Sequence, residues 1–174
     1  MNDAQRKLPS TVGGGIVRVQ LIFNMAEERL YGTMDGLTID THAVAGGRAG
    51  SKTPGAVNPI LANNPFTTHV KLSPQIPGGA LPLGTYSLKS HESRNNWIRL
   101  LPTTGMNMVG RDGFAIHGRG KRGSDGCIVP SDFKVFLTLF TALKKRERLG
   151  ADAPLLSVIA VGELGRFERL LNLA

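Results

Sequence analysis

The sequence predicts a mainly β, single-domain protein with one substantial helix. Short segments in which apolar and polar residues alternate recur along the chain, and a period of two is typical of half-buried strands. The chain has 22 glycines and 10 prolines in 174 residues, and many of them form turn signals between these segments. Only one long stretch, after residue 131, repeats its apolar residues every three or four positions, as an amphipathic helix does.

The chain is long enough for one well-buried core and too short for two comfortable domains. Residues 1–15 are polar and end in three glycines, so we expect a flexible lead-in. Residues 16–162 form the single predicted domain. Residues 163–174 are predicted to form a short amphipathic tail helix, with its apolar face made by Leu164, Phe167, Leu170 and Leu171.

Strands are predicted at residues 17–23, 30–34, 37–44, 85–89, 97–101, 113–117 and 155–161. Between the third and fourth of them, residues 45–84 carry repeated turn signals and little apolar periodicity, which indicates a long and functional loop region. In the segment 113–117, alternation places Ala115 and His117 on the same face. The small Ala115 leaves room beside the imidazole.

The predicted helix begins near residue 131, directly after the only cysteine. Ser131 is the expected N-cap, and Asp132 in the first turn suits the positive end of the helix dipole. Basic residues near the other end suit its negative end in the same way; these are Lys144, Lys145 and Arg146. The apolar stripe consists of Phe133, Phe136, Leu137, Phe140 and Leu143.

The composition favours anionic partners. Twenty-one Lys and Arg against 13 Asp and Glu give a net charge of +8, which attracts nucleic acid, acidic glycans or acidic proteins alike. The first seven residues lack the apolar core of a secretory signal, and no apolar run reaches the roughly 18 residues of a membrane span. We therefore expect a protein made in the cytoplasm without a signal peptide and without membrane insertion.

The candidate site lies between His117 and Cys127, where a glycine-rich and basic segment separates an imidazole from the single thiol. One cysteine cannot form an intrachain disulfide, so its thiol is free. Because a thiol attacks as its thiolate, a nearby imidazole and surrounding cations give this cysteine a route to a depressed pKa. Taken alone, a free cysteine is often a small buried apolar residue, and a strand histidine is often structural. The two together favour a cysteine nucleophile.

Two other interpretations of the glycine segment are weaker. Gly118, Gly120 and Gly123 match G-x-G-x-x-G, but a dinucleotide site needs its third glycine inside an opening helix, and here the helix begins only near residue 131. A zinc site is also disfavoured, because the one cysteine and the histidines show no close ligand pairs. We expect neither a metal nor a cofactor.

Nucleic-acid binding has some support from a basic patch made by Arg111, Arg119, Lys121 and Arg122. Aromatic platforms are scarce, with one tryptophan and two tyrosines, and no helix-turn-helix pattern is present. A basic binding protein without catalysis, acting on nucleic acid or an anionic cell-wall polymer, stays as the alternative to an enzyme.

The site residues resemble the motif of the L,D-transpeptidase catalytic domain, a histidine followed by Ser/Thr-His-Gly-Cys and an apolar residue. The corresponding residues are His117-Gly118 and Ser124-Asp125-Gly126-Cys127-Ile128. Asp125 replaces the second histidine of the motif, and the spacing from His117 to Cys127 is short. Both departures resemble the branch found as type VI secretion effectors, as do Asn63-Asn64-Pro65 and the segment from Gly79 to Tyr86.

The resemblance implies an L,D-transpeptidase-like β-sandwich or barrel and an enzyme that acts on the tetrapeptide stem of peptidoglycan. Cys127 would attack the diaminopimelate carbonyl before the terminal D-alanine, and His117 would accept the thiol proton. Water as the second substrate gives an L,D-carboxypeptidase, and a free D-amino acid gives an exchange transpeptidase. The N–H groups of Gly126 and Cys127 are the expected oxyanion donors, and the carbonyl of Gly118 is expected to orient the imidazole.

The remaining expectations concern the surroundings of the site. Ser124 is expected to brace the loop or contact substrate, Arg119 to bind a substrate carboxylate or remain solvated, and Asp125 to face solvent or pair with a loop cation. Tyr86 and His91 are two further candidates for the substrate site, with packing the preferred role for Tyr86. The resemblance also implies a cognate immunity protein, a component of the type VI secretion machinery as carrier, and action in the periplasm of target bacteria.

Overall fold

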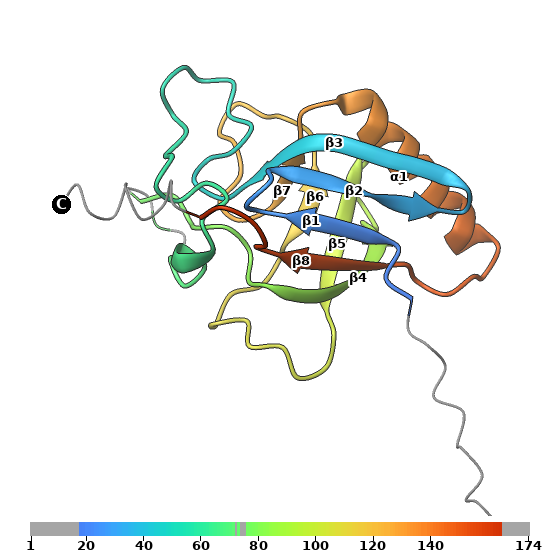
Figure 1. The fold of residues 1–174 in the computed structure, drawn as a ribbon. Helices are drawn as coiled ribbons and strands as arrows, with labels where there is room; N and C mark the ends of the chain where they lie inside the picture. The colour runs from blue at the N-terminus through green and yellow to red at the C-terminus, as the bar shows by residue number, and fades with distance from the viewer. Residues whose placement is uncertain (1–17, 72, 74–75, 165–174) are drawn as a thin grey trace, which may run out of the picture.

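The computed structural model describes residues 18–71, 73 and 76–164 (Figure 1). Its eight strands are β1 (Leu21–Asn24), β2 (Arg29–Met34), β3 (Leu37–Ala45), β4 (Gly84–Ser90), β5 (Trp97–Pro102), β6 (Ala115–His117), β7 (Ile128–Pro130) and β8 (Leu155–Ile159). One α-helix, α1 (Phe133–Arg148), and one short 3-10 helix, η1 (Pro65–Thr67), complete the elements of the described residues.

The strands form a closed barrel in the order β1-β2-β3-β7-β6-β5-β4-β8. Two pairs are parallel, β1 with β8 and β6 with β7, and the other neighbours are antiparallel. The first and last strands pair from Leu21 opposite Leu156 to Asn24 opposite Ile159, and this pair closes the wall. The mainly β class is confirmed, and the architecture is a mixed barrel.

The core fills the inside of this wall, as the alternation in the sequence predicts. Along β3, Ile39, Ala43 and Ala45 are buried and Asp40 and His42 are exposed. The largest completely buried side chains of the described residues include Tyr86, Phe23 and Phe136. Each such apolar side chain contributes about 1.5 to 3 kcal/mol on burial.

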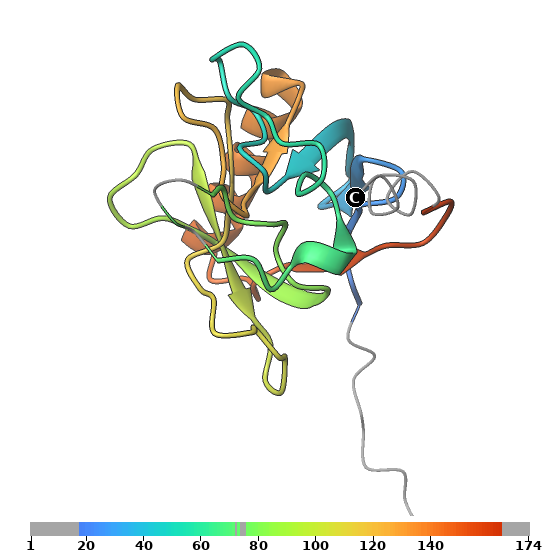
Figure 2. The same ribbon diagram turned by 90° about the vertical axis from the view of Figure 1, so that its left-hand side faces the viewer.

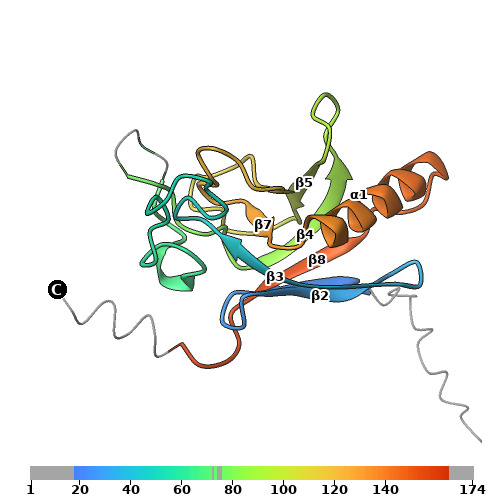
Figure 3. The ribbon, with the colours of Figure 1, turned by 90° about the horizontal axis from the view of Figure 1, so that it is seen from above.

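Helix α1 packs alongside the strands of the barrel. Its buried face consists of Phe136, Leu139, Ala142 and Leu143, and the helix packs against β3, β4 and β7. Seen from above, the helix lies between the β4–β5 pair and the β2–β3 pair (Figure 3). It thereby supports strands on both sides of the core.

The N-cap of α1 is Asp132, and the prediction of Ser131 is wrong. The Asp132 carboxylate accepts hydrogen bonds from the N–H groups of Lys134 at 2.8 Å and Val135 at 3.3 Å. The Ser131 hydroxyl is instead 2.7 Å from the His42 imidazole on β3. A carboxylate suits the positive end of the helix better than a hydroxyl does, and the predicted cluster of cations at the other end is present.

Three strand boundaries differ from the predictions by two residues or more. The first strand begins at Leu21 instead of residue 17, β6 begins at Ala115 instead of residue 113, and the last strand ends at Ile159 instead of residue 161. Strand β7 was not predicted, and it separates Cys127 from the helix. Its three residues end in proline and carry no periodic signal, and they are extended because they pair with β3 on one side and β6 on the other. The predicted tail helix lies, apart from its first two residues, outside the described residues, as does the predicted lead-in.

The long loop regions gather at one end of the barrel (Figures 1 and 2). Asn63 anchors the loop that follows β3: its completely buried side chain accepts the N–H of Ala45 at 2.7 Å and donates to the carbonyl of Ala43 at 3.1 Å. Asn64 caps η1 by accepting the N–H of Phe66. The Asn-Asn-Pro segment therefore fixes the loop to the barrel and contributes no side chain to chemistry.

None of the helices in the described part of the chain is both long and apolar enough to cross a membrane.

Candidate active site

The parallel pair β6–β7 brings the two candidate catalytic residues together. Ile116 lies opposite Ile128 in this pair, so His117 follows the paired position on one strand and Cys127 precedes it on the other. The segment 118–127 links them as a loop. Both residues line a single cavity of about 830 Å³, which we call the His117 cavity. Its other lining residues include Arg94, Trp97, Arg119, Lys121, Arg122, Ser124, Asp125 and Phe133.

The imidazole of His117 is held in one tautomer. Its Nδ1 is 2.8 Å from the carbonyl oxygen of Gly118, and because a carbonyl can only accept, Nδ1 carries the hydrogen. Nε2 is then the nitrogen with a free lone pair. This is the orienting bond that the resemblance implies. A side chain on Gly118 would place its Cβ 2.9 Å from the ring of Phe133, so glycine permits the close approach of the helix.

Burial lowers the pKa of His117 below its ordinary value of 6.5. The bond to the Gly118 carbonyl acts in the opposite direction, and the positive charge of Arg94 acts in the same direction as burial. The imidazole is therefore uncharged at neutral pH, which is the form that can accept a proton.

The expected depression of the cysteine pKa is not found. Burial raises the pKa of the Cys127 thiol, although the N–H of Ala115, the hydroxyl of Ser124 and the charge of Arg111 all act to lower it. The side chain is partly exposed in the cavity. The free protein thus carries a neutral thiol and a neutral imidazole in the same cavity, and not a preformed ion pair.

Three consecutive carbonyls of the nucleophile loop are tied to other segments. That of Asp125 accepts from Arg111 at 2.9 Å, that of Gly126 from the N–H of Leu81 at 3.2 Å, and that of Cys127 from the hydroxyl of Ser124 at 3.0 Å. A trans peptide unit is planar, so its N–H points opposite to its carbonyl. The first two bonds therefore also fix the direction of the N–H groups of Gly126 and Cys127.

Gly126 has to be glycine in this loop. Its φ of 146° is a conformation that other residues rarely adopt. A Cβ there would lie 2.5 Å from the Phe114 ring and 2.7 Å from the Arg111 guanidinium. The residue before the cysteine thus combines an unusual backbone with close packing.

Arg111 was assigned from the sequence only to a basic patch, and its structural role in the site was not predicted. Its guanidinium donates to the carbonyls of Thr68, Ala80, Gly79 and Asp125, at distances of 2.5 to 2.9 Å. It thereby joins the loop after β3 to the nucleophile loop. These partners are 14 to 43 residues away in sequence, so no local pattern could have identified them. Its permanent charge also lies close enough to Cys127 to favour the thiolate.

Three predicted residues of the loop are placed as follows. Ser124 is buried and braces the loop. Asp125 forms an ion pair with Arg122 at 3.2 Å, which confirms the expectation that it pairs with a loop cation. Arg119 is exposed, lines the His117 cavity and has one long contact of 3.5 Å with the carbonyl of Ser51.

Tyr86 and His91 line neither of the cavities that contain Cys127. Tyr86 is completely buried and donates its hydroxyl hydrogen to the carbonyl of Pro82 at 2.7 Å, so its role is packing. His91 accepts the N–H groups of Ser93 and Arg94 and fixes the turn before β5.

A second cavity of about 380 Å³, the Arg111 cavity, is also lined by Cys127. Its lining residues include Lys71, Arg111, Asp112 and Phe114, and it shares Asp125 and Cys127 with the His117 cavity. Cys127 therefore lines both cavities. Among the described residues, no cluster of three His, Cys, Asp or Glu side chains could hold a metal ion.

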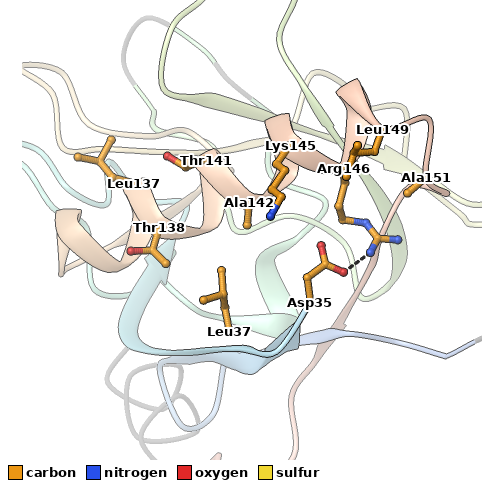
Figure 4. Close-up of a pocket in the computed structure, with 10 residues that line it drawn as sticks. All are labelled: Asp35, Leu37, Leu137, Thr138, Thr141, Ala142, Lys145, Arg146, Leu149 and Ala151. Atoms are coloured by element: carbon orange, nitrogen blue, oxygen red, sulfur yellow. Dashed lines mark hydrogen bonds and ion pairs between the residues drawn. The ribbon is translucent and has the colours of Figure 1, made fainter.

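Another hollow, of about 670 Å³, lies between the second half of α1 and the turn from β2 to β3 (Figure 4). Leu37, Leu137 and Leu149 provide much of its apolar lining, and an ion pair between Asp35 and Arg146 closes one side. It shares no lining residue with the cavities around Cys127 and contains neither a cysteine nor a histidine. It is not part of the candidate active site.

Comparison with known protein families finds a match to the Tlde1 domain over residues 60–151, more than half of the chain. No curated protein and no solved structure matches the sequence. The matched span contains the loop after β3 from residue 60 onward, both cavities and most of the residues described above. The chain therefore belongs to the Tlde1 domain family of L,D-transpeptidase-like type VI secretion effectors, which target peptidoglycan.

Proposed function

We propose that this protein is a cysteine L,D-carboxypeptidase, an exchange L,D-transpeptidase, or both, acting on peptidoglycan tetrapeptide stems. The observation that carries this proposal is the single cavity lined by both the Cys127 thiol and an oriented, uncharged imidazole. The family supplies the substrate class. The residues supply a nucleophile, a base and a fixed loop.

In the first half of the reaction, the sulfur of Cys127 attacks the carbonyl carbon of diaminopimelate while Nε2 of His117 takes the thiol proton. A C–S bond forms, and the carbonyl oxygen becomes an oxyanion at the N–H groups of Gly126 and Cys127. The intermediate then collapses, the C–N bond to D-alanine breaks, and His117 gives its proton to the departing amine. The product on the protein is a thioester.

In the second half, water or the amine of a free D-amino acid attacks the thioester. His117 accepts a proton from this second nucleophile and returns it to the sulfur as the C–S bond breaks. Water releases a tripeptide stem, and the amine forms a new amide bond. Either outcome consumes the tetrapeptide stem that ends in D-alanine.

The neutral thiol has a mechanistic consequence. Because burial raises its pKa, little thiolate exists before substrate arrives, so proton transfer to His117 accompanies the attack. The charge of Arg111 then stabilises the sulfur as its negative charge develops. The free protein is thereby protected from side reactions of a permanent thiolate.

The direct test is release of D-alanine from purified tetrapeptide muropeptides, followed by mass spectrometry. We expect release by the unaltered protein and by His42→Ala, whose histidine is exposed on β3, and none by Cys127→Ala or His117→Ala. Identical product profiles for the unaltered protein and Cys127→Ala would refute the enzymatic proposal. Adding a free D-amino acid to the assay separates exchange from hydrolysis.

We also propose that the protein acts in the periplasm of target bacteria after delivery by the type VI secretion machinery, and that its producer carries an immunity protein. Expression in a susceptible bacterium tests this. Directing the protein to the periplasm should lyse the cells, and retaining it in the cytoplasm should not. Equal toxicity in both compartments, or toxicity that survives Cys127→Ala, would contradict the proposal.

A further inference from the structure

Trp97 and Arg94 lie next to the imidazole without any role in the steps above. Trp97 is the first residue of β5 and lies directly opposite His117 in the antiparallel pair with β6. The two rings stack with centroids 4.2 Å apart and planes 7° apart. The guanidinium carbon of Arg94, in the turn before β5, is 4.8 Å from the centroid of the same indole.

This stack restrains the imidazole in a direction that its hydrogen bond does not. The bond from Nδ1 to the Gly118 carbonyl fixes one edge of the ring but still allows the plane to tilt about that edge. The nearly parallel indole opposes the tilt, because any rotation would bring the two rings into collision or separate them. Together the two contacts determine where Nε2 points.

The charges around the imidazole are mostly positive. Arg94 approaches from the turn before β5. The loop 118–127 contributes Arg119, Lys121 and Arg122, with Asp125 as its carboxylate, and this carboxylate is already paired with Arg122. Helix α1 contributes only the uncharged ring of Phe133, and the Cys127 thiol is neutral in the free protein.

Arg94 differs from the other cations because it shares the indole with His117. An aromatic face attracts a cation, so Trp97 alone would favour a protonated imidazole. With the guanidinium already at that indole, a second positive charge beside it is opposed. Among the cations that line the cavity, only Arg94 contributes to the lowered pKa of His117.

We propose that Trp97 and Arg94 are positioning residues for His117: the indole fixes the plane of the imidazole, and the guanidinium opposes a positive charge on it. The part of this inference that concerns catalysis rests on the proposed function. The part that concerns the imidazole itself does not, so it can be measured without substrate.

The first experiment follows the His117 ring by NMR during a pH titration, with His117→Ala used to assign the signal. Arg94→Gln should raise the pKa of His117, and the matched Arg119→Gln, which removes an exposed cation from the same cavity, should change it less. In D-alanine release, the acidic limb of kcat/KM should move to higher pH for Arg94→Gln only. An unchanged pKa in Arg94→Gln, or an equal rise in both variants, overturns the role of Arg94.

The second experiment separates orientation from binding. Trp97→Leu should lower kcat roughly 10- to 100-fold with little change in KM, because a displaced base slows the chemical step. Trp97→Phe keeps an aromatic ring and should recover most of the loss. A normal kcat in Trp97→Leu overturns the role of Trp97, as does equal loss in both variants. If Cys127→Ala still releases D-alanine, the proposed function fails, and the NMR result continues to decide the effect of Arg94.

Discussion

The two cavities that share Cys127 differ in how their arginine side chains are bound. In the Arg111 cavity, the guanidinium of Arg111 is bound to four backbone carbonyls and is held in one position. In the His117 cavity, Arg119 is exposed and forms one long hydrogen bond, of 3.5 Å, to the carbonyl of Ser51. An arginine thus has a structural role in the Arg111 cavity, where Arg111 holds the loop. In the His117 cavity, the arginine Arg119 is available to bind a ligand.

This difference indicates how the loop can be both rigid and accessible. The carbonyls of residues 125–127 are fixed by Arg111, Leu81 and Ser124, so the nucleophile needs no reorganisation when substrate binds. The larger cavity keeps exposed cations that can meet the carboxylates of a stem peptide. Substitutions on the two sides should therefore have effects of different size.

The largest effect is expected from Arg111→Met, which keeps the length of the side chain and removes its donors and charge. Four carbonyls lose their partner, so the free energy of unfolding should fall by about 2 to 4 kcal/mol, as measured by denaturant unfolding. Loss of the charge should also raise the pKa of the Cys127 thiol, which the pH dependence of its alkylation reports. D-alanine release should fall by at least about 100-fold.

Arg111→Lys is the matched control for that variant. It restores the charge but cannot reproduce the forked set of bonds, so it should recover the alkylation profile more than the stability. Full stability in Arg111→Met would show that the clamp does not hold the loop.

Gly126→Ala should have the next largest effect. The backbone strain of a non-glycine residue at this φ is about 1 to 3 kcal/mol, and the new methyl group would collide with Phe114 and Arg111. We expect roughly 100-fold slower D-alanine release from a protein whose barrel remains folded by circular dichroism. As a control, Gly55→Ala also has a positive φ but meets no atom within 4 Å, and it should leave activity intact.

A smaller effect concerns the pH dependence of activity. A histidine with the ordinary pKa of 6.5 is about one-tenth neutral at pH 5.5, so activity would fall about tenfold. Because the pKa of His117 is lowered, its neutral form persists as the pH falls through 6.5, and the loss in kcat/KM at pH 5.5 should be less than tenfold. A tenfold or greater loss, with the fold intact, would contradict the lowered pKa of His117.

The smallest effect is expected from Arg119→Gln. The exposed guanidinium has little structural role, so stability should stay within about 0.5 kcal/mol of the original value. If this residue meets a substrate carboxylate, KM should rise by roughly threefold to tenfold, since an exposed charged contact contributes modestly. Unchanged KM would leave Arg119 as a solvated side chain and would place carboxylate binding elsewhere in the cavity.

Local patterns predicted much of the barrel. The strands at residues 30–34, 37–44, 85–89 and 97–101 were placed within one residue of β2 to β5, because each has one face in the core and one outside. Strand β7 escaped prediction because its conformation depends on two partner strands and not on its own three residues.

The candidate site was predictable only in part. The pair His117 and Cys127 was indicated by a local motif, and the orienting carbonyl of Gly118 by the resemblance to L,D-transpeptidases. The roles of Arg111 and Trp97 were not indicated, because their contacts join segments that are far apart in sequence, and a distant contact leaves no period in the chain. The direction of the thiol pKa was also missed, since counting nearby cations ignores the desolvation that outweighs them.

The pairing of β1 with β8 affects the order in which this protein can be assembled. Asn24 pairs with Ile159, so the wall cannot close until nearly all of the described chain has left the ribosome. Contacts between residues so distant in sequence are slow to form. A nascent chain would therefore lack the finished barrel, and with it a supported catalytic loop, until the residues of β8 have left the ribosome.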